Sequence, residues 1–474
     1  MSEFEMVIGL EVHVELKTKT KIFCGCSTAF GAEPNTQCCP VCTGMPGSLP
    51  VLNRQVVDYA VKAGLALNCE IAPFSKQDRK NYFYPDLPKA YQISQYDLPL
   101  CRHGYLDIEL DRGGAKRIGI TRIHIEEDAG KLVHLEGQGT LIDCNRCGVP
   151  LIEIVSEPDI RSAQEAKAYV QKLRAIILYT GVSDCRMNEG SLRCDVNLSV
   201  RRKGEERLGT RTEMKNLNSF QSIVRAIEYE YQRQVSVIEA GDRVVQETRR
   251  FDQATGRTTA MRRKEEANDY RYFPDPDLAP IELDGADLDR LRRQIPALPD
   301  QRKAEYVARY GLTPYAAEQL TCSRAVADAF EQAAPDSGYP KLVANLILSE
   351  VAPLLAEGQR IPIAPAHLAQ LARMLGEGRI NSSVCKSVVA QLWEHDRDPD
   401  ALVREQGLEQ ISDERLLTEL ARKVIRDNAS AAAGYRKGKT NALQALVGQM
   451  MRETKGKGNP VRIQEILREL LAET

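Results

Sequence analysis

Residues 7–16 alternate between apolar and polar side chains, and this period of two predicts a β-strand with two different faces. The polar face carries Glu11, His13 and Glu15, whereas every residue between them is apolar. The apolar face is suited to a protein core. The acid–histidine–acid face needs another explanation, because charged side chains are costly to bury without a partner.

Similar alternation continues further along the chain. In residues 192–200 the apolar side chains oppose a polar face that includes Asp195, and Glu213 lies on a shorter strand of the same kind. Residues 244–264 read as a hairpin that turns at Gly256. These segments predict an extensive sheet.

Helical signals separate the strands. Ser162 and Glu165 have the spacing of a capping box, an apolar period of 3.6 follows, and Gly181 is typical of a helix end. A second helix is expected over residues 219–234. The chain up to about residue 290 is therefore predicted to be mixed α+β.

The pattern becomes helical after the segment around Pro296 and Pro299. Thr313-Pro314 has the form of a helix start, and Ser323, Asn381 and Ser412 are further candidate caps. The last helices are expected at residues 413–427, 440–453 and 460–472. We therefore predict an α+β fold with a large mixed α/β domain, an all-helical domain and a small helical tail domain, covering residues 1–294, 295–404 and 405–474.

Composition sets limits on the class of protein. The 474 residues carry 64 basic and 66 acidic side chains, so the net charge of −2 argues against a protein that coats nucleic acid along its whole length. No run of 18 apolar residues and no secretion signal is visible, which predicts a cytoplasmic protein without membrane contact. The 13 cysteines are then expected as reduced thiols or metal ligands.

The polar strand faces suggest a divalent cation site. Glu126, Glu127 and Asp128 end an alternating run, and Glu153 stands alone in a strongly apolar strand. One histidine with several carboxylates is an oxygen-rich set that suits Mg²⁺. The alternative is a solvated sheet face. Neither a P-loop nor a kinase-type glycine-rich loop is present, so any nucleotide is expected to bind in a less familiar arrangement.

Four cysteines have the spacing of paired zinc knuckles: a C-x-C and a C-x-x-C separated by 12 residues, at Cys24, Cys26, Cys39 and Cys42. Cys38 adjoins Cys39, so the choice of ligand between these two stays open, as does a set of free thiols. Cys144 and Cys147 form a second C-x-x-C that has no matching pair. We expect these two to be ordinary thiols.

Two segments mix basic and aromatic residues. One begins at Arg79 and Lys80, and the other contains Arg271. Basic groups beside aromatic rings can hold phosphates and stack bases. An ordered loop whose aromatic residues pack together explains the same pattern.

The tail differs in charge from the whole chain. From residue 421 on, 11 basic and 5 acidic side chains leave a net charge of +6. The basic clusters flank one predicted helix and include Arg436, Lys437, Lys439, Lys455 and Lys457. Such a unit is typical of an electrostatic nucleic-acid contact or of a solvated helical face.

Long segments of the chain, taken in order, resemble one family. These include EMVIGLEVHVEL, CPVCTGMPGSLPVLN, RKNYFYPDLPKAYQISQ, RIHIEEDAGK, VPLIEIVSEPDIRS, EGSLRCDVNLSV, DYRYFPDPDLAP and YRKGKTNALQALVGQMMRETKGKGNP. Together they closely resemble the B subunits of tRNA-dependent amidotransferases. The resemblance runs from residue 5 to the end of the chain.

The resemblance implies an ATP- and Mg²⁺-dependent ligase. It implies that the side-chain carboxylate of misacylated Glu-tRNA(Gln) or Asp-tRNA(Asn) is phosphorylated. Ammonia from a glutaminase A subunit then displaces the phosphate, and a small C subunit holds the other two together in a heterotrimer. The family's metal positions fall on Glu11, His13, Glu127 and Glu153, with Asp195 and Glu213 as further catalytic candidates.

Further roles follow from the same resemblance. The four knuckle cysteines would hold a structural Zn²⁺, the tail would grip tRNA, and Arg79, Lys80 or Arg271 would neutralise phosphate. Cys144 and Cys147 depart from the family pattern. A non-catalytic tRNA-binding scaffold is the alternative, and a metal-dependent nuclease that needs no ATP is a third hypothesis. The sequence leaves open whether Glu-tRNA, Asp-tRNA or both are used.

Overall fold

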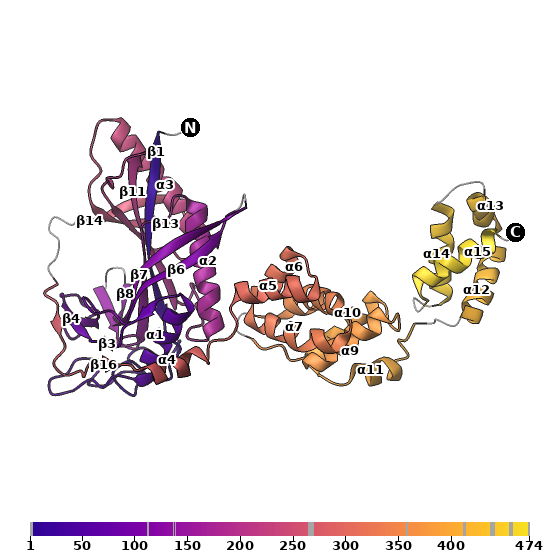
Figure 1. Ribbon diagram of the computed structural model, residues 1–474, viewed down its shortest axis with the longest axis horizontal. Helices are drawn as coiled ribbons and strands as arrows, with labels where there is room; N and C mark the ends of the chain where they lie inside the picture. The colour runs from indigo at the N-terminus through magenta and orange to yellow at the C-terminus, as the bar shows by residue number, and fades with distance from the viewer. Residues whose placement is uncertain are drawn as a thin grey trace. The chain divides into compact units, whose positions relative to one another are not determined.

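The computed structural model consists of two compact units, Met1–Leu298 and Pro299–Thr474 (Figure 1). It describes residues 3–110, 113–135, 137, 139–263, 270–356, 359–410, 414–436, 441–454 and 458–472. The first unit is mixed α+β and the described part of the second contains helices without strands, which confirms the predicted fold class.

A nine-stranded sheet forms the centre of the first unit, in the order β14-β13-β12-β11-β1-β10-β7-β6-β2. Its strands are β1 (Phe4–Glu15), β2 (Glu70–Ile71), β6 (Cys101–Glu109), β7 (Ala115–Glu127), β10 (Pro150–Ser156), β11 (Leu192–Arg202), β12 (Thr212–Lys215), β13 (Glu247–Asp252) and β14 (Arg257–Arg263). Neighbours are antiparallel except β12 and β13, which are parallel. The first predicted strand is thus the middle strand of the sheet.

Three helices cover the apolar face of this sheet. They are α1 (Arg54–Ala66), α2 (Ala163–Thr180) and α3 (Phe220–Glu239), and α2 packs between the other two (Figure 1). Leu10 and Val12 of β1 are at most 1% exposed beneath them. Because side chains alternate along a strand, burial of this set turns Glu11 and His13 to the opposite face.

The helix predicted after Ser162 is confirmed as α2. The Ser162 hydroxyl accepts a hydrogen bond from the Glu165 amide at 3.1 Å, and Gly181 ends the helix with a φ of 72°. The Glu165 carboxylate reaches the Arg161 amide at 2.8 Å, one residue before the position of a reciprocal capping box. The second predicted helix begins after Ser219 as expected but extends to Glu239.

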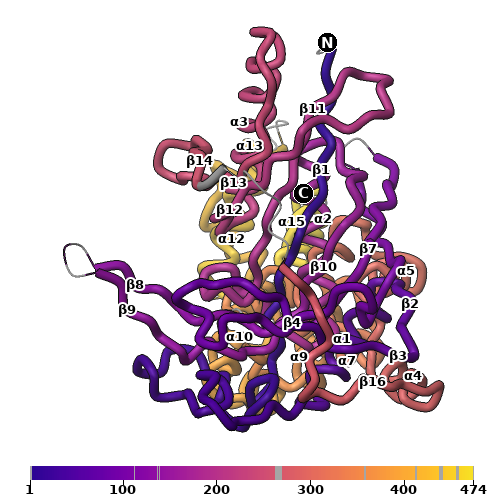
Figure 2. Tube along the Cα trace, turned by 90° about the vertical axis from the view of Figure 1, so that its left-hand side faces the viewer, coloured from indigo at the N-terminus to yellow at the C-terminus, as the bar shows by residue number. Residues whose placement is uncertain are grey.

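Smaller β-elements border the polar face of the large sheet. Strands β15 (Phe273–Pro274), β4 (Asp78–Asn81) and β5 (Tyr91–Ser94) form a three-stranded sheet in that order. β8 (Lys131–Leu135) and β9 (Gly139–Asp143) form a two-stranded ribbon that extends from the body of the unit (Figure 2).

The second unit is helical throughout its described residues. Its helices are α5 (Pro299–Tyr310), α6 (Pro314–Thr321), α7 (Arg324–Ser337), α8 (Pro340–Leu346), α9 (Pro365–Gly376), α10 (Ser382–Glu394), α11 (Pro399–Glu405), α12 (Glu414–Asp427), α13 (Ala429–Arg436), α14 (Asn441–Glu453) and α15 (Pro460–Ala472). The caps at Thr313 and Asn381 are confirmed, whereas Ser323 makes no side-chain capping bond and Ser412 lies outside the described residues.

The last four helices enclose a core of their own that includes Leu417, Leu446 and Leu467. The three predicted tail helices are confirmed. Helix α13 was not predicted, because its alanine-rich sequence has no clear apolar period. The division into three domains at residues 294 and 405 stays a prediction. No helix among the described residues is long and apolar enough to cross a membrane.

Leu10→Ala should destabilise the first unit by roughly 2–5 kcal/mol, because it leaves a cavity under the central strand. Urea denaturation followed by circular dichroism measures the loss. Leu141→Ala is the matched control: Leu141 is 60% exposed, so its truncation should change stability by less than about 0.5 kcal/mol. Equal effects of the two changes would contradict the placement of β1 in the core.

A candidate metal centre in a polar cavity

The polar face of the large sheet brings ionisable residues into register. His13 of β1 lies opposite Glu153 of β10, and Glu153 in turn lies opposite His124 of β7. On the other side of β1, Glu11 lies opposite Asp195 of β11. Directly opposed residues of an antiparallel sheet point to the same face. Residues distant in the sequence therefore form one continuous charged surface.

Two groups on this surface have the geometry of metal ligands. In the first, single ligand atoms of His13, Glu126 and Glu153 lie within 4.8 Å of one another. In the second, the same holds for Glu11, Asp195 and Glu213. One cation could contact all three members of either group.

Hydrogen bonds orient both groups. His124 Nε2 lies 3.2 Å from Glu126 Oε1 and 3.4 Å from Glu153 Oε2. In the second group, Lys215 Nζ lies 2.7 Å from Asp195 Oδ2 and 3.0 Å from Glu213 Oε1. The first group is thus held by an imidazole and the second by an ammonium group.

The electrostatics reflect the crowding of carboxylates. Burial raises the pKa of Glu11, and the charges of Glu153 and Glu213 raise it further. Burial also raises the pKa of Glu153, but His124 and His13 outweigh this effect and hold it well below its usual value. Burial lowers the pKa of His124, but Glu153 and Glu126 raise it to about 9. This surface stabilises positive charge, as a cation site must.

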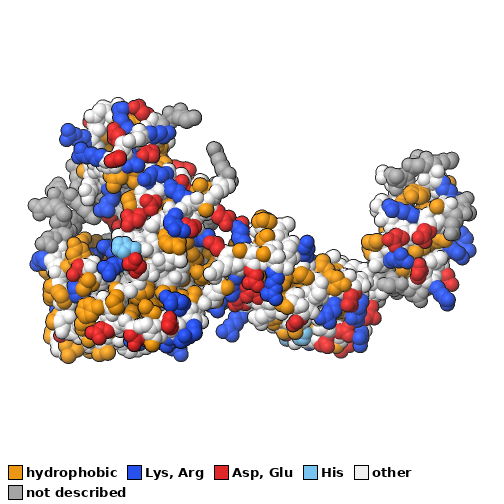
Figure 3. Space-filling model, in the orientation of Figure 1, with side chains coloured by type: hydrophobic (Ala, Val, Ile, Leu, Met, Phe, Trp, Pro, Cys, Tyr) orange, Lys and Arg blue, Asp and Glu red, His pale blue; other side chains and the backbone are white. Residues whose placement is uncertain are grey.

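Both groups line one cavity of about 660 Å³, a volume in the range of small-molecule sites. Its other charged lining residues include Lys80, Arg122 and Arg193. The buried Nε atoms of these two arginines have no hydrogen-bond partner in the described structure. In Figure 3 a histidine lies beside acidic and basic side chains on the surface of the first unit. The cavity combines cation ligands with donors for an anion.

The structure divides the predicted metal group: His13 and Glu153 lie in the first group, Glu11 lies in the second, and Glu127 lies in neither. Glu127 points to the other face of β7, where its carboxylate contacts Lys89 and accepts a hydrogen bond from the Ile93 amide at 2.8 Å. Glu126 takes its place, since adjacent residues of a strand face opposite sides. His124 was also not predicted to be a site residue. It lies two residues before Glu126, so period-two reasoning applied to RIHIEE identifies both.

Of the three predicted phosphate-binding cations, only Lys80 lines the cavity. Arg79, its neighbour on β4, points away and pairs with Asp275 at 2.7 Å and with Asp277 at 3.0 Å. Its guanidinium therefore has carboxylate partners. Arg271 is exposed and is not part of the cavity lining. Arg79 and Arg271 were predicted to neutralise phosphate because Arg79 adjoins Lys80 and Arg271 lies between two tyrosines in the sequence.

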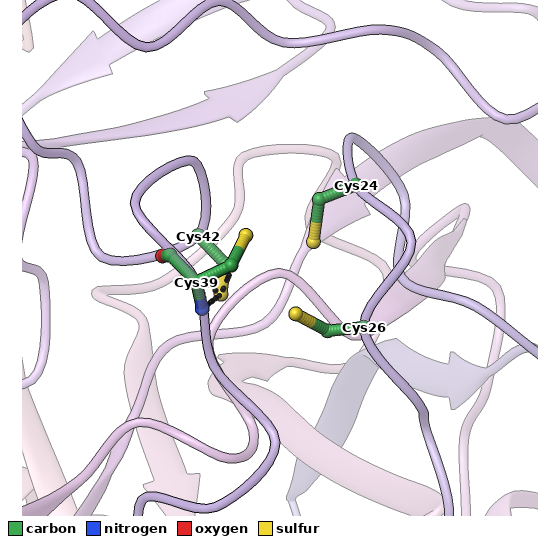
Figure 4. A group of neighbouring side chains, drawn as sticks. All are labelled: Cys24, Cys26, Cys39 and Cys42. Carbon is green, nitrogen blue, oxygen red and sulfur yellow. Dashed lines mark hydrogen bonds between the residues drawn. The ribbon is translucent and has the colours of Figure 1, made fainter.

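The four knuckle cysteines also converge. Cys24 and Cys26 on one loop point towards Cys39 and Cys42 on the facing loop, and their sulfur atoms lie within 4.8 Å of one another (Figure 4). The Cys39 amide donates to Cys42 Sγ at 3.1 Å. Hydrogen bonding from Cys24 lowers the pKa of Cys42 to about 4. Four converging cysteine sulfur atoms are a usual ligand set of a structural Zn²⁺.

The structure distinguishes these cysteines from their neighbours. Cys38 lies outside the group, with its Sγ 3.2 Å from the Asn35 carbonyl oxygen, so Cys39 is the member of the adjacent pair that faces the other thiols. Cys144 and Cys147 form a turn in which the Cys147 amide donates to the Cys144 carbonyl at 3.1 Å. They belong to no group of three or more potential ligands among the described residues.

The basic tail is described in part. Arg436 is exposed at the end of α13, whereas Lys437, Lys439, Lys455 and Lys457 lie outside the described residues. On α12, Arg422, Lys423 and Arg426 are exposed. Lys423 Nζ lies 3.1 Å from a carboxylate oxygen of Glu453 on α14.

Comparison with known proteins assigns this chain to a family. Residues 6–289 match the GatB/GatE catalytic domain, and residues 328–471 match the GatB domain. The B subunit of an aspartyl/glutamyl-tRNA(Asn/Gln) amidotransferase from Caldicellulosiruptor saccharolyticus is 56% identical over 99% of both chains. Proteins of the same name from Carboxydothermus hydrogenoformans and Geotalea daltonii are 55% and 54% identical, over 100% and 98% of both chains.

These matches cover nearly the whole chain, including the cavity and the helices of the second unit. The chain therefore belongs to the GatB/GatE family of tRNA-dependent amidotransferase subunits.

Proposed function

We propose that this protein amidates misacylated Glu-tRNA(Gln), Asp-tRNA(Asn) or both, as the catalytic B subunit of an amidotransferase. ATP phosphorylates the side-chain carboxylate of the misacylated residue, and ammonia then replaces the phosphate. The products are the correctly charged Gln-tRNA(Gln) or Asn-tRNA(Asn), ADP and phosphate. The observation that carries this proposal is the pair of metal-ligand groups in one cavity of a chain with these relatives.

The chemistry explains why such a cavity is needed. A carboxylate is a poor electrophile, and phosphorylation gives it a leaving group. Phosphoryl transfer depends on positioning and on neutralisation of charge. His13, Glu126 and Glu153, and likewise Glu11, Asp195 and Glu213, would hold Mg²⁺, which would supply that neutralisation of charge.

The chain's own cations complete the site. Three basic side chains line the same cavity: Lys80, Arg122 and Arg193. They would hold phosphate oxygens through charge-assisted hydrogen bonds. Arg193 is itself positioned by Asp128, whose Oδ2 lies 2.6 Å from Arg193 Nη2. The cavity walls would keep water from the acyl phosphate. Exclusion of water matters because hydrolysis of the acyl phosphate would consume ATP without forming an amide.

Ammonia must come from elsewhere, since the sequence contains no evident glutaminase nucleophile motif. The relatives carry the name of a subunit, which supports a multi-subunit enzyme. We propose a glutaminase A subunit as the ammonia source and a small C subunit as the third component. The tail, with a net charge of +6 from residue 421 on, would contact the tRNA backbone.

A non-catalytic scaffold that only delivers tRNA is not favoured. Convergent carboxylates are costly, because each raises the cost of burying the next. A scaffold that only delivers tRNA has no need for them. A metal-dependent nuclease differs in requiring no ATP, so omission of ATP from the assay separates it from the proposed enzyme.

The four converging cysteines are proposed to hold a structural Zn²⁺. Their loops, which contain the segment CPVCTGMPGSLP, are rich in proline and glycine and expose Met45 and Leu49. Such loops have little apolar core to order them, so a tetrahedral metal would supply the missing constraint.

Glu153→Ala is expected to abolish ATP-dependent amidation while tRNA binding persists, because Glu153 joins the metal group of the first unit whereas the basic tail belongs to the second unit. The measurement is amidation of each misacylated tRNA by the assembled complex, with and without ATP. Glu70→Ala, which removes an exposed carboxylate from the same sheet, is the control and should retain activity. Full activity of Glu153→Ala would refute the assigned site.

Removal of residues 411–474 is expected to weaken tRNA binding and to make its salt dependence shallower, because fewer phosphate contacts release fewer counterions. The cut lies before α12, so it removes the last four helices together with the core that they enclose. A triple substitution of Arg436, Lys437 and Lys439 by alanine removes charge without removing helices, and should weaken binding less. Affinities unchanged at several salt concentrations would count against the tail as a contact.

Cys39→Ser should lower the zinc content of the purified protein and its melting temperature, because the group loses one of its thiolates. Cys38→Ser is the matched control, since the adjacent Cys38 faces the Asn35 carbonyl. Zinc is measured by atomic absorption. Equal zinc in both variants would show that Cys39 is not a ligand.

A further inference from the structure

Lys21 carries an ammonium group although 0% of the residue is exposed. It lies just before the loop that contains Cys24 and Cys26. A lysine is almost never fully buried unless its charge has a partner, because moving a charge from water into a protein interior is costly. The burial of Lys21 therefore needs an interaction that compensates for this cost.

The Lys21 ammonium has two hydrogen-bond acceptors. Its Nζ donates to Cys42 Sγ at 3.5 Å and to the Cys144 carbonyl oxygen at 3.2 Å. Among the residues that the structure describes, no carboxylate forms an ion pair with this ammonium. A carbonyl group and a neutral thiol would leave the buried charge without a counter-charge, whereas a Cys42 thiolate would supply one.

A second lysine of this region has a different partner. Lys21 and Lys89 both line a cavity of about 200 Å³ beside Cys24 and Cys42. The Lys89 ammonium contacts the Glu127 carboxylate, so its charge is already matched. Lys21 is therefore the lysine of this cavity that directs its charge to a cysteine.

The backbone fixes Lys21 against the cysteine group. The Lys21 amide donates to the Cys26 carbonyl at 2.9 Å, and the amide of the next residue, Ile22, donates to the Gly148 carbonyl at 2.9 Å. These two bonds join the residue to the first cysteine loop and to the turn after Cys144. The direction of the lysine side chain is thus set from both sides.

The chemistry of a zinc centre explains why a buried cation is useful at this position. When four thiolates hold one Zn²⁺, their negative charges exceed the two positive charges of the ion. Cys42 is the buried member of the four cysteines, so water is least able to stabilise its thiolate. The Cys39 amide, which donates to Cys42 Sγ (Figure 4), and the Lys21 ammonium take the place of water. Hydrogen bonds of this kind orient metal ligands and tune their affinity.

We propose that Lys21 is a positioning residue of the zinc centre. Its ammonium holds the Cys42 thiolate through a charge-assisted hydrogen bond and offsets part of the excess negative charge of the four thiolates. The inference rests on the structural Zn²⁺ of the proposed function. It assigns part of the affinity for the metal to a lysine outside the group of ligands.

The experiment compares zinc affinities of the full-length protein by competition with a chromogenic chelator. Lys21→Met removes the charge but keeps a long side chain, and it should weaken zinc binding by about 10- to 100-fold, as for other residues that orient metal ligands. Lys21→Arg keeps the charge and should bind zinc more tightly than Lys21→Met. Lys19→Met is the matched control, because Lys19 is exposed two residues earlier and should not influence the affinity.

A second measurement separates a role at the metal from the loss of a buried side chain. The melting temperature of each variant is recorded with zinc bound and after zinc has been removed. If Lys21 acts on the zinc centre, Lys21→Met should reduce the difference between these two temperatures, because weaker binding gives less stabilisation. If Lys21 serves packing alone, both temperatures should fall together and their difference should stay unchanged.

Three results would overturn the inference. They are an unchanged zinc affinity in Lys21→Met, equal affinities of Lys21→Met and Lys21→Arg, and an unchanged difference between the two melting temperatures. Failure of the proposed zinc centre has a different signature. In that case the unsubstituted protein would bind no zinc and Cys39→Ser would change nothing, and both proposals would fall together.

Discussion

The strict alternation of side chains along β1 is the constraint on which the rest of the first unit depends. Leu10 and Val12 are buried under the helices on one face, and this forces Glu11 and His13 onto the other. Because β1 is bonded to both β10 and β11, its two faces set the faces of its neighbours as well. A shift of one residue in register would move the carboxylates into the core. Hydrophobic burial on one side thus fixes the chemistry on the other.

Such a concentration of acids would be unstable without compensation. His124 contacts Glu126 and Glu153, and Lys215 contacts both Asp195 and Glu213. These cations reduce repulsion between carboxylates, and a divalent ion would perform the same role more strongly. The cavity therefore favours positive charge among these carboxylates.

A second, buried polar network fixes the far end of the sheet. Glu230 of α3 is completely buried and accepts hydrogen bonds from Thr212 of β12 at 3.0 Å and from Thr258 of β14 at 2.9 Å. Arg233 pairs with the same carboxylate at 2.6 Å. The network ties α3 to β12 and β14, and the short strand β12 carries Glu213, which lines the cavity. Satisfied buried networks of this kind specify one arrangement of the elements around them.

Four features were predictable from the sequence alone, because each depends on local periodicity, spacing or long matching segments: the strand around Glu11 and His13, the capped helix after Ser162, the group of four cysteines and the family. Tertiary structure decided which neighbours share a face. It selected Glu126 over Glu127, Lys80 over Arg79, and Cys39 over Cys38. In each pair the residues are adjacent and chemically alike, so composition cannot separate them. The direction in which each side chain points is set by sheet pairing and loop packing over long sequence distances, and it therefore becomes visible only in the folded chain.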